Sequence, residues 1–434
     1  MINKLKNYWE IIVIFLLSLT PLTWFKNDQI IFGHDSGFRL NYLDHLRNLF
    51  YSWNPIGNFG YDWGILKGFL IIQVPETFFS WLFNSLTAGE KISFILWFFV
   101  MGISMYIFIS YFFPQKKFWI FRLFSSAFYM YNFFLLQGWF IAERAKFSLY
   151  AALPLGLLII YRLLNKDLSL IKGTIIFSFI FFFLNGGGNP TLYGVLLLVY
   201  SLTFIYLTFI NYLKNGSREI IYSTKVALSL ILGTFLINAY WILNHIYLAI
   251  NKYASSLSSF GGIQGILAWE NEVNKSASFI NLLRLQGIPD WYDNPLHPYS
   301  GFFLNDPVLI ALSFFPILII LLGLFLYHKE AITKKQKTLL YLVFLIFIIG
   351  LVFAAGSHKP LGLIYIFLIE HLPGFAIFRS AFYKFSPAVW FSIIFLSGYF
   401  LNLLIYRYLN SSLLRRLAGF FAISFILLYH FPFF

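Results

Sequence analysis

Asp35 is the acidic residue whose surroundings best suit a bound ligand. It lies between Gly33 and Gly37, and glycines let the backbone turn sharply and let another molecule approach closely. From residue 38 onward leucines recur at helical spacing, which predicts an amphipathic helix lying in a membrane interface. A carboxylate at the entrance of such a helix can serve in proton transfer. The alternative is that Asp35 caps the helix.

A second aspartate, Asp44, lies on the polar side of the same predicted helix. Its simpler interpretation is an ion pair with Arg47 or Arg39, because charged residues about one turn apart on a helix come close together. We keep Asp44 beside Asp35 as a candidate catalytic residue.

Arg379 and Lys384 form a cationic pair near the end of the chain. Arginine offers a planar fork that matches phosphate, and lysine offers a point charge, so the pair suits a phosphate group. The alternative is that both side chains reach toward lipid headgroups.

Four further residues are candidates for binding a polar substrate. Glu143 lies in a short turn, where a local ion pair with Lys146 is the simpler interpretation. Asn189 follows three glycines, and asparagine beside glycine is first of all a turn former. Arg284 and Trp291 belong to a long aromatic loop. Such rings stack on sugars but also form the belts of membrane proteins at the interface.

A metal site receives weak support. His34 beside Asp35, and His297 near Asp290 and Asp293, offer ligands for Mg²⁺ or Mn²⁺. Neither spacing is a recognised ligand motif, so we predict no metal and no cofactor, with a divalent cation left open. The chain has no cysteine, which excludes disulfides and thiolate metal sites.

These residues are set in a chain that is mostly apolar. Of its 434 residues, 59% are hydrophobic, 22% are aromatic and only 11% are charged, which excludes an ordinary soluble domain. The sequence predicts an all-α polytopic membrane protein with a single domain over 1–434. About eleven apolar segments are long enough to span a bilayer: 10–25, 92–113, 119–136, 147–164, 168–185, 190–212, 224–250, 306–327, 338–355, 385–406 and 415–431. Two shorter or interrupted stretches, 66–86 and 360–372, are predicted to be interfacial or re-entrant.

The charge distribution predicts the orientation. Threading the spans with the N-terminus inside leaves 18 of the 31 basic residues and only four acids on the inner side, so that side carries the whole net charge of +14. No loop shows a basic stripe interleaved with stacking aromatics, so a nucleic-acid partner is not expected. The outer loops 26–91, 251–305 and 356–384 hold the unusual residues and form the expected active-site face.

The order of these features resembles the GT-C glycosyltransferases, integral membrane enzymes that take a sugar from a polyprenyl-phosphate carrier. In that superfamily a carboxylate in the first outer loop precedes an interfacial helix and a long series of spans. Several stretches resemble the transmembrane module of the alpha-(1→3)-arabinofuranosyltransferases of bacterial envelopes, namely 125–164, NGGGNPT (185–191), SASFINLLRLQGIPDWY (276–292) and FRSAFYKFSP (378–387). Large members continue into soluble carbohydrate-binding regions, so we expect either a short relative or a truncated chain.

This resemblance implies an inverting transfer of an arabinofuranose-like sugar from a polyprenyl-phosphate donor to a glycan acceptor. The reaction would take place at the outer face of a prokaryotic cytoplasmic membrane. Asp35 would act as general base on the acceptor hydroxyl, while Arg379 and Lys384 would stabilise the leaving phosphate. The resemblance also marks Glu143 as a position of interest.

Two other classes remain open. A flippase or transporter of a lipid-linked sugar would explain many spans, but it would place ionisable residues inside them, near the midplane. A scaffolding protein would not need the combination of Asp35, Arg379 and Lys384.

Overall fold

In the computed structural model of this chain, the described residues are 2–26, 28–31, 41–51, 53–54, 61–62, 64–135, 144–293, 299–326 and 332–433. Four residues named in the predicted sites lie outside this part: His34, Asp35, Glu143 and His297. The regular secondary structure of the described residues is helical apart from one antiparallel pair of short strands, β1 (Trp53–Asn54) and β2 (Tyr61–Asp62). The predicted all-α class is therefore confirmed.

The helices group into two compact units. The first unit comprises Met1–Leu17, Met105–Trp139 and Phe260–Phe434, and the second comprises Ser18–Ser104 and Phe140–Ser259. The helix α4 (Leu86–Phe112) contributes to both units. Each unit has its own central helix.

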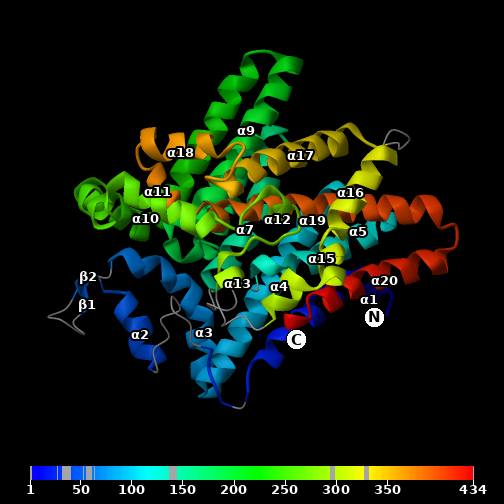
Figure 1. The fold of residues 1–434 in the computed structure, drawn as a ribbon, viewed down its shortest axis with the longest axis horizontal. Helices are drawn as coiled ribbons and strands as arrows, with labels where there is room; N and C mark the ends of the chain where they lie inside the picture. The colour runs from blue at the N-terminus through cyan, green and yellow to red at the C-terminus, as the bar shows by residue number, and fades with distance from the viewer. Residues whose placement is uncertain are drawn as a thin grey trace. The chain divides into compact units, whose positions relative to one another are not determined.

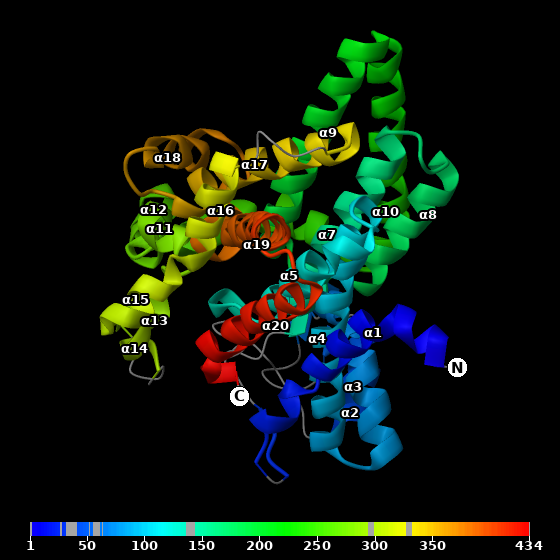
Figure 2. The same ribbon diagram turned by 90° about the vertical axis from the view of Figure 1, so that its right-hand side faces the viewer.

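The centre of the first unit is α19 (Ala381–Tyr408), whose most apolar stretch is 94% buried. Figure 2 shows it nearly end-on, with α5, α16 and α17 around it. Close packing depends on glycine at the contacts, since a Cβ on Gly398 would lie 2.1 Å from Ser125 Oγ. The other helices of this unit are α1 (Ile2–Leu17), η3 (Lys116–Phe118), α5 (Trp119–Met130), α11 (Gly262–Asn274), α12 (Phe279–Leu283), α13 (Pro289–Asp293), α14 (Ser300–Asn305), α15 (Pro307–Ser313), α16 (Phe315–Leu326), α17 (Lys334–Ala355), α18 (Gly362–His371), η7 (Phe375–Phe378), α20 (Ser412–Tyr429) and η8 (Phe431–Phe433).

The centre of the second unit is α7 (Arg144–Leu164), whose most apolar stretch is 89% buried. It packs against α8, α9 and α10, which are drawn in green shades in Figure 1. The outermost of these, α10, exposes Ile231, Leu236 and Leu243, as expected for side chains that face lipid. The elements of this unit are η1 (Thr20–Trp24), α2 (Tyr42–Leu49), η2 (Gly64–Gly68), α3 (Phe69–Phe83), α8 (Leu170–Phe183), η4 (Gly186–Gly188), η5 (Pro190–Tyr193), α9 (Gly194–Asn215) and α10 (Arg218–Ser259).

Seven helices within the described residues are long and apolar enough to cross a membrane, or eight if the bent pair α15 and α16 counts as one span. They indicate a multi-pass membrane protein that has the lipid bilayer as a partner. They correspond to eight of the predicted segments, from 92–113 and 147–164 to 415–431. The predicted number of about eleven spans is not confirmed.

The remaining three predicted spans correspond to shorter helices. The segment 10–25 is divided between α1 and the 3-10 helix η1, which has Pro21 in its first turn. The segment 119–136 contains α5, which has 12 residues and ends where Tyr131 becomes extended. The segment 168–185 contains the 14 residues of α8. At 1.5 Å per residue, helices of 12 to 14 residues reach only about 20 Å, against a hydrocarbon core of about 30 Å.

The two stretches predicted to be interfacial or re-entrant also form short helices. The stretch 66–86 contains α3, with 15 residues, and the stretch 360–372 contains α18, with 10 residues. Both are shorter than the roughly 20 residues that a spanning helix needs.

Candidate functional site

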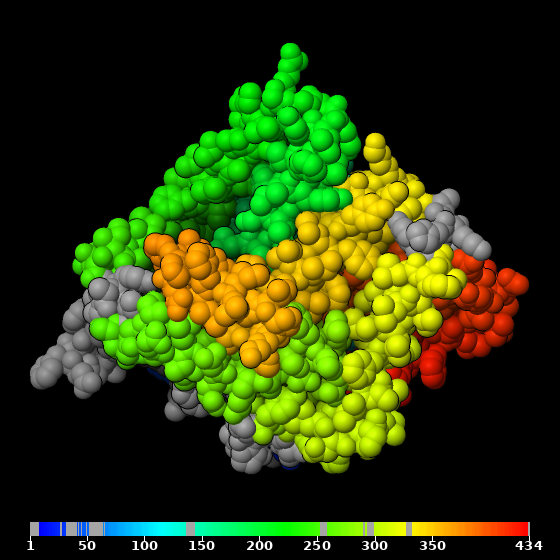
Figure 3. Space-filling view, turned by 45° about the horizontal axis from the view of Figure 1, so that its top comes forward, coloured from blue at the N-terminus to red at the C-terminus, as the bar shows by residue number. Residues whose placement is uncertain are grey.

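The first unit brings together residues 260–305 of the predicted outer loop 251–305 and the whole of the predicted outer loop 356–384. In the space-filling view α18, drawn in orange, lies at the surface between α11 and α17 (Figure 3). The helix α11 also contacts the start of α19. The two segments are joined by side-chain bonds rather than by apolar packing alone, and these bonds define the candidate site.

Glu270 and Asn274 lie one turn apart on α11 and both contact the beginning of α19. Glu270 Oε2 accepts a hydrogen bond from the Ala381 backbone N–H at 3.0 Å, and Asn274 Oδ1 accepts one from the Phe382 N–H at 3.2 Å. These are amides of the first turn of α19, which have no acceptor within their own helix. A different helix therefore caps α19, and this fixes the position of the residues just before it.

Glu270 is completely buried. Burial raises the pKa of its carboxyl to about 8, and the hydrogen bonds from the Ala381 and Ser357 backbones oppose this shift only in part. There is no room beside Glu270 for a side chain at position 356, since a Cβ on Gly356 would lie 2.1 Å from Glu270 Oε1. The carboxyl group is thus mostly protonated at neutral pH.

Arg379 lies two residues before α19, at the end of η7. Its guanidinium stacks over the Phe260 ring, with 4.1 Å between the guanidinium carbon and the ring centroid. Its Nε is buried and has no hydrogen-bond partner, and no ion pair joins it to an acid within the described residues. Burial lowers the pKa of Arg379. A bound anion would replace the hydrogen bonds to water that burial takes from this guanidinium, and it would stabilise the charged form.

The two residues that flank Arg379 are hydrogen-bonded to other helices. Tyr365 donates a hydrogen bond of 2.7 Å from its hydroxyl to the Phe378 carbonyl oxygen, and Trp269 Nε1 donates one of 3.0 Å to Ser380 Oγ. Lys384 lies half-buried on the first turn of α19. The structure therefore places both predicted phosphate-binding residues in one rigid segment.

The other substrate-binding candidates of the first unit are engaged with the protein. Arg284 donates from Nε to Ser313 Oγ at 2.7 Å and from Nη2 to the Phe303 carbonyl at 3.3 Å. Trp291 is 3% exposed and packs edge-on against Phe133, with 5.1 Å between ring centroids. Arg284 holds α12 against α14 and α15, and Trp291 offers no free ring face for a sugar.

The candidates of the second unit, Asp44 and Asn189, lie at the starts of helices. Asn41 caps α2 by accepting from the Asp44 backbone N–H at 3.1 Å, and its side-chain amide donates to Asp44 Oδ2. Asn189 Oδ1 accepts from the Thr191 N–H at 3.1 Å and from its hydroxyl at 2.9 Å, at the start of η5. The expectation that asparagine forms the turn at 185–191 is met. Their catalytic and substrate-binding roles stay predictions, as do those of Asp35 and Glu143.

Sequence reasoning missed a buried cluster of charges in the second unit. Arg144 Nη1 lies 2.5 Å from Glu76 Oε2 and 3.6 Å from Glu90 Oε1, and all three side chains are less than a tenth exposed. Glu90 also accepts a hydrogen bond from the Ile31 backbone N–H at 2.9 Å. The available signal was the presence of Glu76 and Glu90 in otherwise apolar helices, where an acid needs a buried partner.

No group of three or more His, Asp or Glu side chains in the described part of the chain could hold a metal ion. No family model, no curated protein and no solved structure matches this chain.

Proposed function

We propose that this protein is a membrane glycosyltransferase that moves an arabinofuranose-like sugar from a polyprenyl-phosphate donor to an envelope glycan. The observation that carries the proposal is Arg379, a partly buried cation with an unpaired Nε, held beside Lys384 where two loops meet. The sequence resemblance gives that segment the role of holding the donor phosphate.

The chemistry of this site suits a leaving phosphate. A departing phosphate diester is already a weak base, so it needs cations and no proton donor. Arg379 is set on an aromatic ring, Tyr365 bonds the carbonyl of the residue before it and Trp269 bonds the hydroxyl of the residue after it, so little side-chain freedom is lost when an anion binds. In the proposed reaction Asp35 takes the acceptor proton as the hydroxyl attacks the anomeric carbon and the phosphate leaves.

The test is sugar transfer by membranes that carry matched amounts of each variant. The donor is radiolabelled polyprenyl-phospho-arabinose. Arg379→Ala is expected to lower transfer by about 100-fold, the usual effect of removing one group that stabilises developing charge. Arg379→Lys keeps the charge but loses the fork, so it should fall between wild type and Arg379→Ala. Arg218→Ala, which removes an exposed arginine at the start of α10, is the control.

Asp35→Asn is the second test, because it leaves the shape of the side chain but removes the base. It should abolish transfer while leaving the amount of folded protein unchanged. If Arg379→Ala transferred sugar at the wild-type rate, Arg379 would have no role in binding the donor phosphate. Failure of the wild type to transfer from this donor, and from other polyprenyl-phosphate sugars, would overturn the proposed function.

The cluster of Arg144, Glu76 and Glu90 favours a flippase as the second candidate. Ionisable residues buried in apolar helices mark substrate or proton pathways in many transporters. In liposomes with purified protein, a flippase would move the labelled lipid between leaflets without an acceptor. Transfer to an acceptor without such movement would exclude it.

A further inference from the structure

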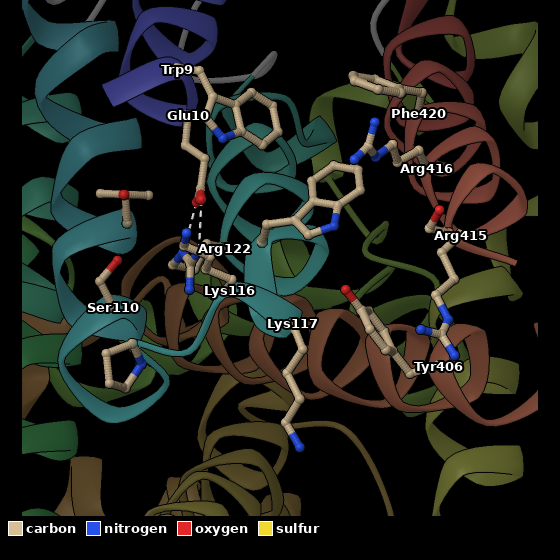
Figure 4. A pocket seen from close by; sticks show the side chains of 14 residues that line it. Trp9, Glu10, Ser110, Lys116, Lys117, Arg122, Tyr406, Arg415, Arg416 and Phe420 are labelled. Atoms are coloured by element: carbon tan, nitrogen blue, oxygen red, sulfur yellow. Dashed lines mark hydrogen bonds and ion pairs between the residues drawn. The ribbon is translucent and has the colours of Figure 1, made fainter. Parts of the chain in front are cut away.

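A cavity of about 1050 Å³ lies in the first unit, where α1, α5 and α20 meet the ends of α4 and α19. Figure 4 shows its walls, with the Arg416 side chain from α20 directed into the space. Five of its lining residues are bases: Arg122, which pairs with Glu10, and the four remaining bases Lys116, Lys117, Arg415 and Arg416. It has far more room than one inorganic phosphate requires.

Glu10, the acid among the lining residues, does not neutralise the positive charge of the cavity. Glu10 forms two bonds of 2.6 Å with Arg122 Nε and Nη2, and both side chains are buried, so these two charges cancel. Arg415 donates to the Leu409 carbonyl oxygen at 2.7 Å and stacks on the Tyr406 ring. No acid forms an ion pair with the four bases in the described part of the chain. The cavity therefore carries an excess of about four positive charges.

The rings beside these bases connect the cavity to a lipid-facing surface. Trp9 lies 5.4 Å from Trp119, and Trp119 lies 5.6 Å from Phe420, measured between ring centroids, so an aromatic wall runs from α1 to α20. On α20, Leu417 and Phe421 are 56% and 75% exposed. Bases and aromatic rings next to an exposed apolar face are what the headgroup and chains of a lipid require.

The cavity is distinct from the proposed phosphate site. Arg379 precedes the first residue of α19, whereas Tyr406 and Arg415 of the cavity lie near the other end of that helix or beyond it. A helix of 28 residues is about 42 Å long, which exceeds the hydrocarbon core of about 30 Å. The two sites therefore lie at opposite ends of one spanning helix.

We propose that this cavity binds the phosphate headgroup of an anionic phospholipid. The four bases contact the headgroup phosphate, the aromatic wall covers its glycerol region, and the acyl chains lie along α20. This role is independent of the proposed transferase activity. Basic pockets between membrane helices are known to select anionic lipids in this way.

The experiment measures lipid binding to the purified full chain in a neutral detergent by native mass spectrometry. The probes are phosphatidylglycerol, phosphatidylcholine with the same chains, and inorganic phosphate. We expect phosphatidylglycerol to bind more tightly than phosphatidylcholine. Each base near an anionic headgroup contributes about fivefold, so Arg415→Ala/Arg416→Ala should weaken binding about 30-fold.

Two further variants keep the result interpretable. Lys214→Ala/Arg218→Ala removes two exposed bases outside the cavity and should leave phosphatidylglycerol binding unchanged. Arg416→Ala alone removes an exposed side chain, so it should fold normally and weaken binding about fivefold. Equal losses in the cavity and control variants would overturn the proposal. It would also fail if inorganic phosphate bound as tightly as the lipid, since the pocket would then be a site for free phosphate.

Discussion

Glu270→Gln is the sharpest test of the junction between α11 and α19. The fully buried carboxyl caps the first turn of α19 and has a pKa raised from its ordinary value of 4.5 to about 8. Glutamine keeps the shape and still accepts the Ala381 N–H through its carbonyl oxygen. It cannot ionise, so the substitution removes the cost of burying a charge while preserving the cap.

The size of the effect follows from the pKa difference. The folded state holds the proton more tightly than the unfolded state, so stability from this group is fully present below pH 4.5 and is lost as the pH rises through about 8. At 1.36 kcal/mol for each unit of pKa, the loss above pH 8 amounts to roughly 5 kcal/mol. Glu270→Gln should therefore match the wild type near pH 4 and exceed it in stability at pH 9.

The assay is thermal unfolding of the detergent-solubilised protein between pH 4 and pH 9. Glu272→Gln is the matched control, because Glu272 lies on the same helix, is 70% exposed and pairs only with Lys275 at 2.9 Å. The wild type and Glu272→Gln should lose Tm as the pH rises from 5 to 9, while Glu270→Gln should lose much less. The reasoning is wrong if Glu270→Gln shows the same decline as the wild type.

Three other substitutions test the packing. Arg144→Ala leaves two buried acids without a cation and should cost about 3–5 kcal/mol, seen as loss of monodisperse protein in size-exclusion chromatography; adding Glu76→Gln and Glu90→Gln should restore it. Asn185→Ala removes hydrogen bonds to Gly68, Tyr240 and Gly187 and should cost about 2–3 kcal/mol, measured as a lower Tm. Gly398→Val forces a side chain against Ser125 and should cost about 1–3 kcal/mol, whereas Gly216→Ala, which has no neighbour within 4 Å, tests backbone conformation alone in the same Tm assay.

Much of the fold followed from composition, and the deviations have a local cause. The apolar run 338–355 formed a long helix because nothing interrupts it, and 385–406 did so although Pro387 and Asn402 lie inside α19. The run 119–136 is equally apolar, yet α5 ends at Met130, since Asn132 accepts a hydrogen bond from the Leu135 N–H and starts a new turn. Hydropathy averages over such a side chain and cannot detect it. A polar residue of this kind is one reason why the predicted number of spans is not confirmed within the described residues.

The candidate site was only partly visible in the sequence. Arg379 and Lys384 could be chosen because a local segment contains both. Glu270 could not, because its significance depends on capping a helix that begins 111 residues later. Trp291 shows the converse, since an aromatic residue in a long loop looked exposed but is buried against Phe133. Contacts between residues far apart in the sequence determine the surroundings of both Glu270 and Trp291, and residue type and spacing do not reveal such contacts.

The arrangement of buried charges separates structural roles from functional ones. Glu10 pairs with Arg122, the acids Glu76 and Glu90 share Arg144, and Glu270 accepts a hydrogen bond from a backbone amide. Each of these charges has a partner that explains why it is buried. The guanidinium of Arg379 is partly buried on a ring, with its Nε left unsatisfied. A partly buried guanidinium that has an unsatisfied Nε and forms no ion pair within the described residues has a place for an anion. The transfer assay with Arg379→Ala tests whether that anion is the donor phosphate.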